Sequence, residues 1–571
     1  MFLFSQSRFH NALLAALLLV LATFATQARS QADNAGPSVG QSRILLVLPF
    51  DNLTNPIAVT PAANGAVSPD PASLDWIREA APEILNSRFT SAGFLPLTRE
   101  DRLYALDHLG LPETFQPSRA TALRIAQTLD ANFIMIGSYR AEGTTLTLKA
   151  RIVDVGKLSL SGEVTESGPI AQLIPLLNSL AWQLTRKLDP NFGVAEETFR
   201  AAGSNLRLDA FEQYIRGLTG RDTAERLRHL KRATDLNPDF TEAWLATAKL
   251  QFASQQYEQA AVSFSKVTHT FNGSDPASLE AGFYRGLSLI FSGNYPRAEE
   301  AFAVVARVLP LPEVVNNEAV ANSRHNRDAV TAIALFRQAA AADPTDADYH
   351  FNLAVSLHRH GDKPEALTEL AQSLNLHPND SEAKALEQAW KNPAGPSATA
   401  PAPLERIKRT YDGAAFRQAS LMLDQLESAR LAALPAPQRA VKLSASAREK
   451  LDRGLLLEAE SGYQAALAAD DHSAEAHAGL AQVRERAGDN DAARTEAQAS
   501  LARQPNLDAY LVLARLDLAA NRLPEARDDD DAALKLDPTS RAAKDLRKAI
   551  DARIEIRPAS EVKPSAASPT V

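Results

Sequence analysis

A repeat of 34 residues organises the sequence after residue 207. Three kinds of residue recur with this period. The small residue is Ala298, Ala332 and Ala366; the large apolar residue is Phe302, Phe336 and Leu370; and the proline is Pro310, Pro344 and Pro378. A second set of alanines, Ala459, Ala493 and Ala526, is spaced by 34 and 33 residues. Such a period indicates stacked copies of one supersecondary unit, which bury their apolar faces only against their neighbours.

Each copy is expected to be a pair of antiparallel helices. Alanine fits where helices cross closely, the large apolar residue fills the space between units, and proline ends the second helix because it lacks an N–H. The first helix should carry an aromatic, a leucine and a small residue, as Tyr349, Leu353 and Ala354 do, with Gly361 in the following turn. In this pattern the chain resembles the tetratricopeptide repeat family, which implies an all-α solenoid.

The repeats fall into two predicted arrays. About five repeats occupy residues 207–390, and about three occupy the C-terminal part of residues 404–550. Residues 391–403 (KNPAGPSATAPAP) are rich in proline and alanine and are predicted to be a linker. Residues 404–432 fit the repeat poorly, and we predict that they form a helical segment that caps the second array. Residues 556–571 are predicted to be a disordered tail.

Residues 43–190 predict a different architecture, an α/β domain with a mixed sheet. Apolar or alternating segments indicate strands at 43–50, 133–139, 144–154 and 158–165. Helical periodicity is found at 73–92, 118–130 and 168–188. The fold class expected for the whole chain is therefore an α/β domain followed by an all-α solenoid of two helical-repeat arrays.

Two motifs of this domain suggest a second family. The sequence LPFDNLTN occupies residues 48–55, and residues 129–139 are Leu-Asp-Ala-Asn-Phe-Ile-Met-Ile-Gly-Ser-Tyr. In these motifs the domain resembles the small α/β domain of TolB-like and FlgO-like bacterial envelope proteins, although its loop at 55–72 is longer than expected. The resemblance implies a binding or docking module rather than a catalyst.

The start of the sequence predicts export. Residues 12–25 (ALLAALLLVLATFA) are apolar and are followed by small residues, so residues 1–32 are interpreted as a signal peptide and residues 33–42 as a disordered lead. The alternative is an uncleaved membrane anchor, although this stretch is shorter than the roughly 20 residues that span a bilayer. An exported chain without cysteine favours a bacterial periplasm.

Composition narrows the function further. With 60 basic and 69 acidic residues the net charge is −9, which gives no general attraction to nucleic acid. The absence of cysteine excludes disulfides and thiolate chemistry. Phosphate loops, nucleophile elbows and zinc-protease helices are not found in the sequence, so we expect no enzymatic activity, no catalytic residues, no cofactor and no metal.

The concave face of the first array is the candidate binding site, because the first helix of each pair lines that face in the repeat family. The partner is expected to be a protein or an extended peptide of unknown identity. An alternative is that the apolar part of this surface only packs internally. The predicted groove residues are Leu245, Lys249, Phe252, Phe283, Leu287, Ile290, Phe291, Asn317, Arg324, Phe351, Val355, His358 and Arg359.

The function expected from these features is that of a non-enzymatic adaptor or scaffold in the bacterial cell envelope. The alternative is a ligand-sensing module whose α/β domain binds a small molecule or a glycan, with the repeats relaying the signal.

One residue does not fit the pattern of the last repeat. Asp530 takes the position filled by Phe302 and Phe336 in the first array. Since a buried unpaired carboxylate is costly, we expect either a splayed repeat or a shift of register at this point.

Overall fold

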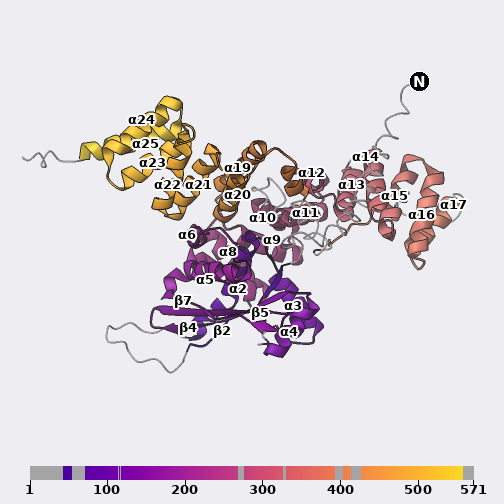
Figure 1. Cartoon of the computed structure of the whole chain (residues 1–571). Helices are drawn as coiled ribbons and strands as arrows, with labels where there is room; N and C mark the ends of the chain where they lie inside the picture. The colour runs from indigo at the N-terminus through magenta and orange to yellow at the C-terminus, as the bar shows by residue number, and fades with distance from the viewer. Residues whose placement is uncertain are drawn as a thin grey trace, which may run out of the picture. The chain divides into compact units, whose positions relative to one another are not determined.

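The computed structural model describes residues 43–54, 71–113, 115, 117–267, 276–325, 330–392, 403–411, 413 and 426–556. The predicted signal peptide and lead (1–42), most of the predicted linker, and the tail beyond residue 556 lie outside the described residues. No described helix is long and apolar enough to cross a membrane. Figure 1 shows the strands of the N-terminal part and the helices that follow them.

The N-terminal part contains the predicted mixed sheet. Its strands are β1 (Ile44–Val47), β2 (Asp51–Asn52), β3 (Leu95–Pro96), β4 (Phe133–Glu142), β5 (Thr145–Asp154), β6 (Ser159–Leu160) and β7 (Val164–Pro169). The order is β3-β1-β4-β5-β6, with β2 also paired to β4 and β7 to β5. β1 is parallel to β3 and β4, whereas β5 is antiparallel to β6 and β7. The strand predicted at 158–165 is thus two strands, β6 and β7.

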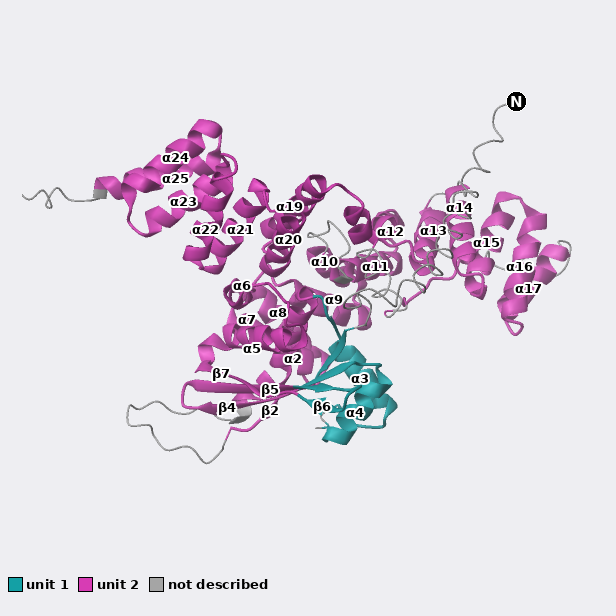
Figure 2. Cartoon of the chain, in the orientation of Figure 1, with its two compact units in different colours: residues 1–47, 93–135, 152–160 teal, residues 48–92, 136–151, 161–571 magenta. Residues whose placement is uncertain are grey.

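The chain divides into two compact units, which Figure 2 colours separately. The first comprises residues 1–47, 93–135 and 152–160, and its described helices are α3 (Arg99–His108) and α4 (Arg119–Thr128). The second comprises residues 48–92, 136–151 and 161–571. It holds α2 (Ile77–Ser91), α5 (Leu173–Leu188), α6 (Glu196–Ala201) and all the helical repeats.

Helix pairs follow one another from residue 208. In the first array, within the described residues, the pairs are α7 (Leu208–Thr219) with α8 (Thr223–Leu236), α9 (Thr241–Ala253) with α10 (Tyr257–Val267), α11 (Pro276–Phe291) with α12 (Tyr295–Val308), α13 (Pro312–His325) with α14 (Val330–Ala342), and α15 (Ala347–His360) with α16 (Lys363–Leu376), followed by α17 (Ser381–Lys391). The second array pairs α19 (Ala436–Asp452) with α20 (Leu456–Ala469), α21 (Ala474–Ala487) with α22 (Asn490–Leu501), and α23 (Leu507–Ala519) with α24 (Leu523–Leu536), and ends in α25 (Arg541–Ile556).

The repeating residues occupy the positions that the pattern predicts. Ala298, Phe302 and Phe336 are fully buried between helices. Pro344 follows α14 and ends it, because proline cannot continue the hydrogen-bond ladder. Gly361 ends α15 with φ of 105°, a left-handed conformation that residues with a Cβ rarely adopt. The predicted fold class, an α/β domain followed by helical-repeat arrays, is confirmed.

The helix predicted from residue 404 is wrong for residues 404–411. These residues have no helical hydrogen bonding, and helix is described only at residue 413 and again from residue 426. The physical reason lies in the first array, whose side chains take up the backbone hydrogen bonds that a helix would otherwise satisfy.

The unusual residue Asp530 is paired with a cation from the next helix. Asp530 is fully buried in α24, and its Oδ2 accepts a hydrogen bond of 2.7 Å from Nε of Arg547 on α25. Arg547 also pairs with the exposed carboxylate of Asp531. An ion pair thus replaces the phenylalanine of earlier repeats, and α24 remains a continuous helix through this position.

We predict that Arg547→Ala destabilises the second array by about 2–4 kcal/mol, because it leaves the Asp530 carboxylate buried without its cation. The double variant Asp530→Leu/Arg547→Leu should stay within about 1 kcal/mol of the natural chain, since neither charge is then buried alone. Urea unfolding followed by circular dichroism measures both. The control is Arg541→Ala, which removes an arginine of the same helix whose side chain is 96% exposed. An equal loss of unfolding free energy in the control and in Arg547→Ala would contradict the prediction.

Candidate functional site

An extended stretch of the chain lies against the first helices of the first array. Residues 404–411 (LERIKRTY), here named the groove segment, are bound by side chains of α11, α13, α15 and α17. The contacting residues are far apart in sequence: Asn352 and Arg406 are 54 positions apart, and Asn317 and Lys408 are 91 apart. The predicted concave surface is therefore occupied by the chain itself.

Asparagine side chains hold the backbone of this segment at alternate residues. Asn352 Nδ2 donates to the carbonyl of Arg406 at 2.8 Å, and the Arg406 amide donates back to Asn352 Oδ1 at 2.6 Å. One repeat earlier, Asn317 Nδ2 donates to the carbonyl of Lys408 at 2.8 Å, and the Lys408 amide donates to Asn317 Oδ1 at 2.9 Å. Each asparagine thus imitates the edge of a neighbouring β-strand.

A third asparagine links these two amide clamps. Asn316 Nδ2 donates to the Arg406 carbonyl at 3.1 Å, and its Oδ1 accepts from Asn352 Nδ2 at 2.8 Å. The side chains of Asn316, Asn317 and Asn352 are all fully buried. Buried amides need partners, so this network fixes the orientation of both clamps while the segment supplies the remaining hydrogen bonds.

The acidic residue of the segment lies between cations. Glu405 is buried, with 3% of its surface exposed, and its Oε1 accepts from Arg359 Nη1 and from Ser323 Oγ, both at 2.6 Å. Arg324 lies 3.8 Å from the other carboxylate oxygen and donates to the Glu405 carbonyl at 2.9 Å. This end of the groove therefore selects for a carboxylate.

The next residue, Arg406, lies among carboxylates of two helices. Its guanidinium is 2.6 Å from Asp380, 3.1 Å from Asp348 and 3.0 Å from Glu382. It also lies over the ring of Phe351, with Cζ 3.7 Å from the ring centroid, which adds a cation–π contact. A planar cation satisfies this arrangement better than a point charge, because it can bind several carboxylates and stack at once.

Lys408 repeats this chemistry one step along the groove. Its Nζ lies 2.6 Å from Asp346 and 2.8 Å from Asp348, and 5.0 Å from the ring centroid of Tyr349. Burial alone would raise the pKa of Asp348, but hydrogen bonds from Lys408 and Arg406 bring that pKa below its ordinary value. The Asp348 carboxylate is therefore charged at neutral pH when the segment is in place.

The remaining side chains of the segment meet the aromatic part of the groove. Ile407 packs on the core cluster that contains Phe283 and Leu287. The guanidinium of Arg409 lies 5.3 Å from the ring centroid of Phe291, and the ring of Tyr411 meets Phe283 edge to face at 5.1 Å. The segment thus runs from α15 and α17 back towards α11, against the order of the repeats.

Six of the predicted groove residues contact the groove segment. Asn317 and Arg324 bind its backbone, and Arg359 binds the Glu405 carboxylate. The other three contribute rings, and they are Phe283, Phe291 and Phe351.

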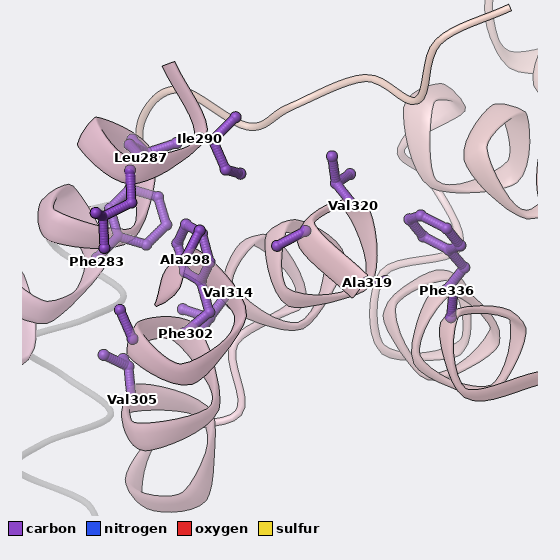
Figure 3. Packing of buried hydrophobic residues seen from close by; sticks show 14 of the residues in the cluster. Phe283, Leu287, Ile290, Ala298, Phe302, Val305, Val314, Ala319, Val320 and Phe336 are labelled. Atoms are coloured by element: carbon purple, nitrogen blue, oxygen red, sulfur yellow. The ribbon is translucent and has the colours of Figure 1, made fainter. Parts of the chain in front are cut away.

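Other predicted groove residues pack within the array. Leu287 and Ile290 belong to a core cluster with Phe302, as Figure 3 shows, and Val355 is buried in another cluster with Phe351 and Leu370. His358 stacks on Trp390, with ring centroids 4.1 Å apart. Burial lowers the pKa of His358, which disfavours the charged form of its ring.

The three predicted residues of α9 make contacts with neighbouring helices. Leu245 packs on the cluster of Ala248 and Phe264, and Lys249 forms an ion pair of 3.0 Å with Glu280 on α11. Phe252 contacts the rings of Tyr257, Tyr284 and Phe291. Internal packing, the alternative considered from the sequence, therefore describes this part of the surface.

Most of the polar half of the site was not predicted from the sequence. Asn316 and Asn352 are absent from the predicted groove, because a buried asparagine carries no signal unless its partner is known. The carboxylates that bind the cations of the segment are absent as well, and they are Asp346, Asp348, Asp380 and Glu382. The charged residues Glu405, Arg406 and Lys408 were the available clue, but such charges are equally common on a solvated helix.

Two other places in the described part of the chain bring polar side chains together. Among the described residues, Asp470, Asp471 and His472 bring three potential metal ligands within 4.8 Å, but Asp471 and His472 are exposed, and such groups are common on surfaces without a metal. A hollow of about 380 Å³ is lined by Gln482, Glu485, Arg486 and Arg515. These last residues belong to α21 and α23 and not to the sheet, where the sensing alternative would place its ligand.

Paired helices that follow one another along the chain define a helical-repeat protein, whose first array holds an extended segment of its own chain. Comparison with family profiles identifies the repeats: one tetratricopeptide repeat profile matches residues 324–389, and another matches residues 283–346 and 479–541. The chain therefore contains tetratricopeptide repeats in both arrays, as predicted. The comparison with curated proteins gave no match, and no comparison names the N-terminal α/β domain, so its resemblance to TolB-like proteins stays a prediction.

Solved structures of similar fold are tetratricopeptide repeat proteins. YrrB, described as having an unusual peptide-binding site, is 13% identical with a TM-score of 0.28, and the match covers 37% of this chain and 99% of YrrB. MamA from Desulfovibrio magneticus is 19% identical with a TM-score of 0.28, over 31% and 99% of the two chains. The repeat domain of P58(IPK) is 17% identical with a TM-score of 0.20, over 61% and 98%. These likenesses concern the fold alone.

We predict that Asn352→Ala accelerates amide hydrogen exchange over residues 403–411 by about ten- to a hundredfold, because it removes the two-way clamp on Arg406 and leaves its buried backbone groups unpaired. Exchange measured by mass spectrometry tests this. The control is Asn322→Ala, which removes a buried asparagine on α13. The Asn322 side chain donates a hydrogen bond of 2.9 Å to Glu299 and not to the segment. Equal acceleration in both variants would show that general loosening, and not the clamp, is responsible.

Proposed function

We propose that the chain is a non-enzymatic interaction scaffold that binds an extended segment of a partner protein in the groove of its first repeat array. The observation that supports this most directly is the pair of amide clamps, in which Asn317 and Asn352 bind the backbone of alternate residues. Such contacts are available to an extended peptide of almost any sequence.

Specificity is added by the charged side chains around the clamps. Arg324 and Arg359 bind a carboxylate, whereas Asp348 and Asp380 bind a guanidinium on the following residue. Backbone recognition gives affinity in this arrangement, and the side-chain pockets choose among sequences. A protein partner is expected to present the same order of charges on a segment that lies outside its own folded core.

The proposed location is the bacterial cell envelope. The apolar stretch at residues 12–25 with small residues after it, the lack of cysteine, and the resemblance of residues 43–190 to TolB-like and FlgO-like domains support an exported adaptor. In this proposal the α/β domain docks on an envelope component while the repeats bind the partner. Anchoring by an uncleaved N-terminal helix is the alternative.

The binding proposal predicts a loss of affinity that does not depend on peptide sequence. Extended peptides are selected by display against the full chain in which residues 404–411 have been replaced by a glycine–serine stretch of equal length. The affinities of the selected peptides should fall about ten- to a hundredfold when Asn317→Ala and Asn352→Ala are added, since four backbone hydrogen bonds are lost. Asn322→Ala serves as the matched control, and peptides that bind equally well without the clamps would refute the groove as their site.

Export predicts a defined mature protein. When the full chain is produced in a bacterial host, the periplasmic fraction should contain a form that begins after Ala28 or Ala32, as measured by fractionation and terminal mass spectrometry. Deletion of residues 12–25 should leave the protein in the cytoplasm. Recovery of the full-length chain with the membrane would favour the anchored alternative, and recovery in the cytoplasm would contradict export.

A further inference from the structure

The groove of the first array is filled by residues 404–411 of the same chain. The charged residues of this segment pair with those of the groove at successive positions. Glu405 lies between Arg324 and Arg359, and Arg406 and Lys408 share the carboxylate of Asp348. The backbone clamps and the ion pairs act on the same residues, so the segment is recognised in the way that a ligand would be.

We propose that residues 404–411 are an internal competitor for the first groove, and that the partner is an extended segment of the same chemistry, with an acidic residue followed by cations one and three positions later. This inference rests on the proposed function of the groove as a peptide-binding site. It adds the charge pattern of the partner and the requirement that the chain's own segment be displaced.

The partner's charge pattern follows from what the vacated groove would contain. Without Arg406 and Lys408, the carboxylates of Asp348 and Asp380 would face each other without their cations, and Asp380 is only 8% exposed. Without Glu405, Arg324 and Arg359 would lose their anion. Since half-buried charges are costly when unpaired, a replacing segment must supply the same charges in the same order.

Competition within one molecule lowers the apparent affinity for any external peptide. The groove segment is covalently attached to the array that it fills. It therefore competes at a high effective concentration, which is commonly millimolar for a linked segment. A free peptide binds only the fraction of molecules whose groove is vacant, so its apparent Kd equals the intrinsic Kd divided by that fraction. Weakening the internal segment should therefore strengthen binding of an external peptide to an unchanged groove.

The test uses the full chain and a fluorescent synthetic peptide with the sequence of residues 403–411 (PLERIKRTY). The variant Arg406→Glu/Lys408→Glu places negative charge against Asp348 and Asp380 and should release the internal segment without changing any helix of the groove. The matched control is Arg541→Glu/Lys544→Glu, the same two charge reversals on exposed residues of α25. Circular dichroism checks that all three proteins are folded.

We expect the variant to bind the peptide at least about tenfold more tightly than the natural chain, and the control to bind like the natural chain. Amide exchange over residues 403–411 should be slow in the natural chain, independent of protein concentration, and fast in the variant. Equal peptide affinity of the natural chain and the variant would overturn the internal competition. Rapid exchange in the natural chain would overturn it as well, and so would protection that persists in the variant. Protection that is lost on dilution would also overturn it, because the bound segment would then come from a second copy of the chain.

The charge pattern is tested by changing the peptide. Peptides that carry Glu405→Gln, or Arg406→Gln with Lys408→Gln, should each bind the variant chain at least about tenfold more weakly than the natural sequence. Equal affinity of the three peptides would overturn the assigned partner chemistry.

Failure of the underlying function gives a different result. If exchange shows that the variant has released its segment and the peptide still does not bind, the groove is not a peptide site, and the proposed function falls together with the inference. If the natural chain and the variant bind equally well, and Asn352→Ala weakens both, the groove function stands and only the internal competition is overturned.

Discussion

The recognition of the groove segment depends on the match between one step of the repeat array and two residues of an extended chain. Asn317 and Asn352 stand on the first helices of successive repeats, and they clamp Lys408 and Arg406, which are two positions apart. Two residues of a strand advance by about 6.6 Å, and the N–H and C=O of alternate residues point to the same side. A side-chain amide offers both a donor and an acceptor in the same plane, so one asparagine per repeat is sufficient to follow such a chain.

This match also fixes where the side chains of the segment must go. Because side chains alternate along an extended chain, the two clamped residues present their side chains in the same direction, and both cations reach Asp348. The intervening Ile407 meets the apolar cluster around Phe283. A shift by one residue would place the isoleucine against carboxylates and a cation against the aromatic floor, so charge and apolarity specify the register that the backbone clamps alone leave free.

The sequence predicts the scaffold well and the occupant poorly, and the reason is physical. Ala298, Phe302 and Pro310 carry constraints that are repeated in every unit, so their period reveals the helix pairs without knowledge of any partner. The groove segment occurs once, and its structure is determined by side chains that lie far from it in sequence. Its mixture of charged and apolar residues has good helix propensity, which tertiary contacts override here. Asn352 likewise gives no signal in the sequence, because a buried amide can be recognised as a binding group only when its partner is known. Asp530 is the opposite case: the repeat pattern marked it as anomalous, and the cation that explains it came from the next helix.

The balance of contacts in the groove suits an occupant that can be exchanged. The helices that build the floor bury their own apolar residues against one another, as Phe283 and Phe302 do, so the array keeps its core whether or not a segment is bound. The segment is held mainly by hydrogen bonds and ion pairs, which a replacing segment that carries the same groups can form in its place. Several of its cations remain partly exposed, such as Lys408 with 18% of its side-chain surface accessible. A segment held by deep apolar anchors would leave a large apolar surface exposed on departure, and would behave as part of the core. Polar clamps with matched charges instead fit the proposed groove, one that is specific in sequence and reversible in occupancy, which is the combination that an interaction scaffold needs.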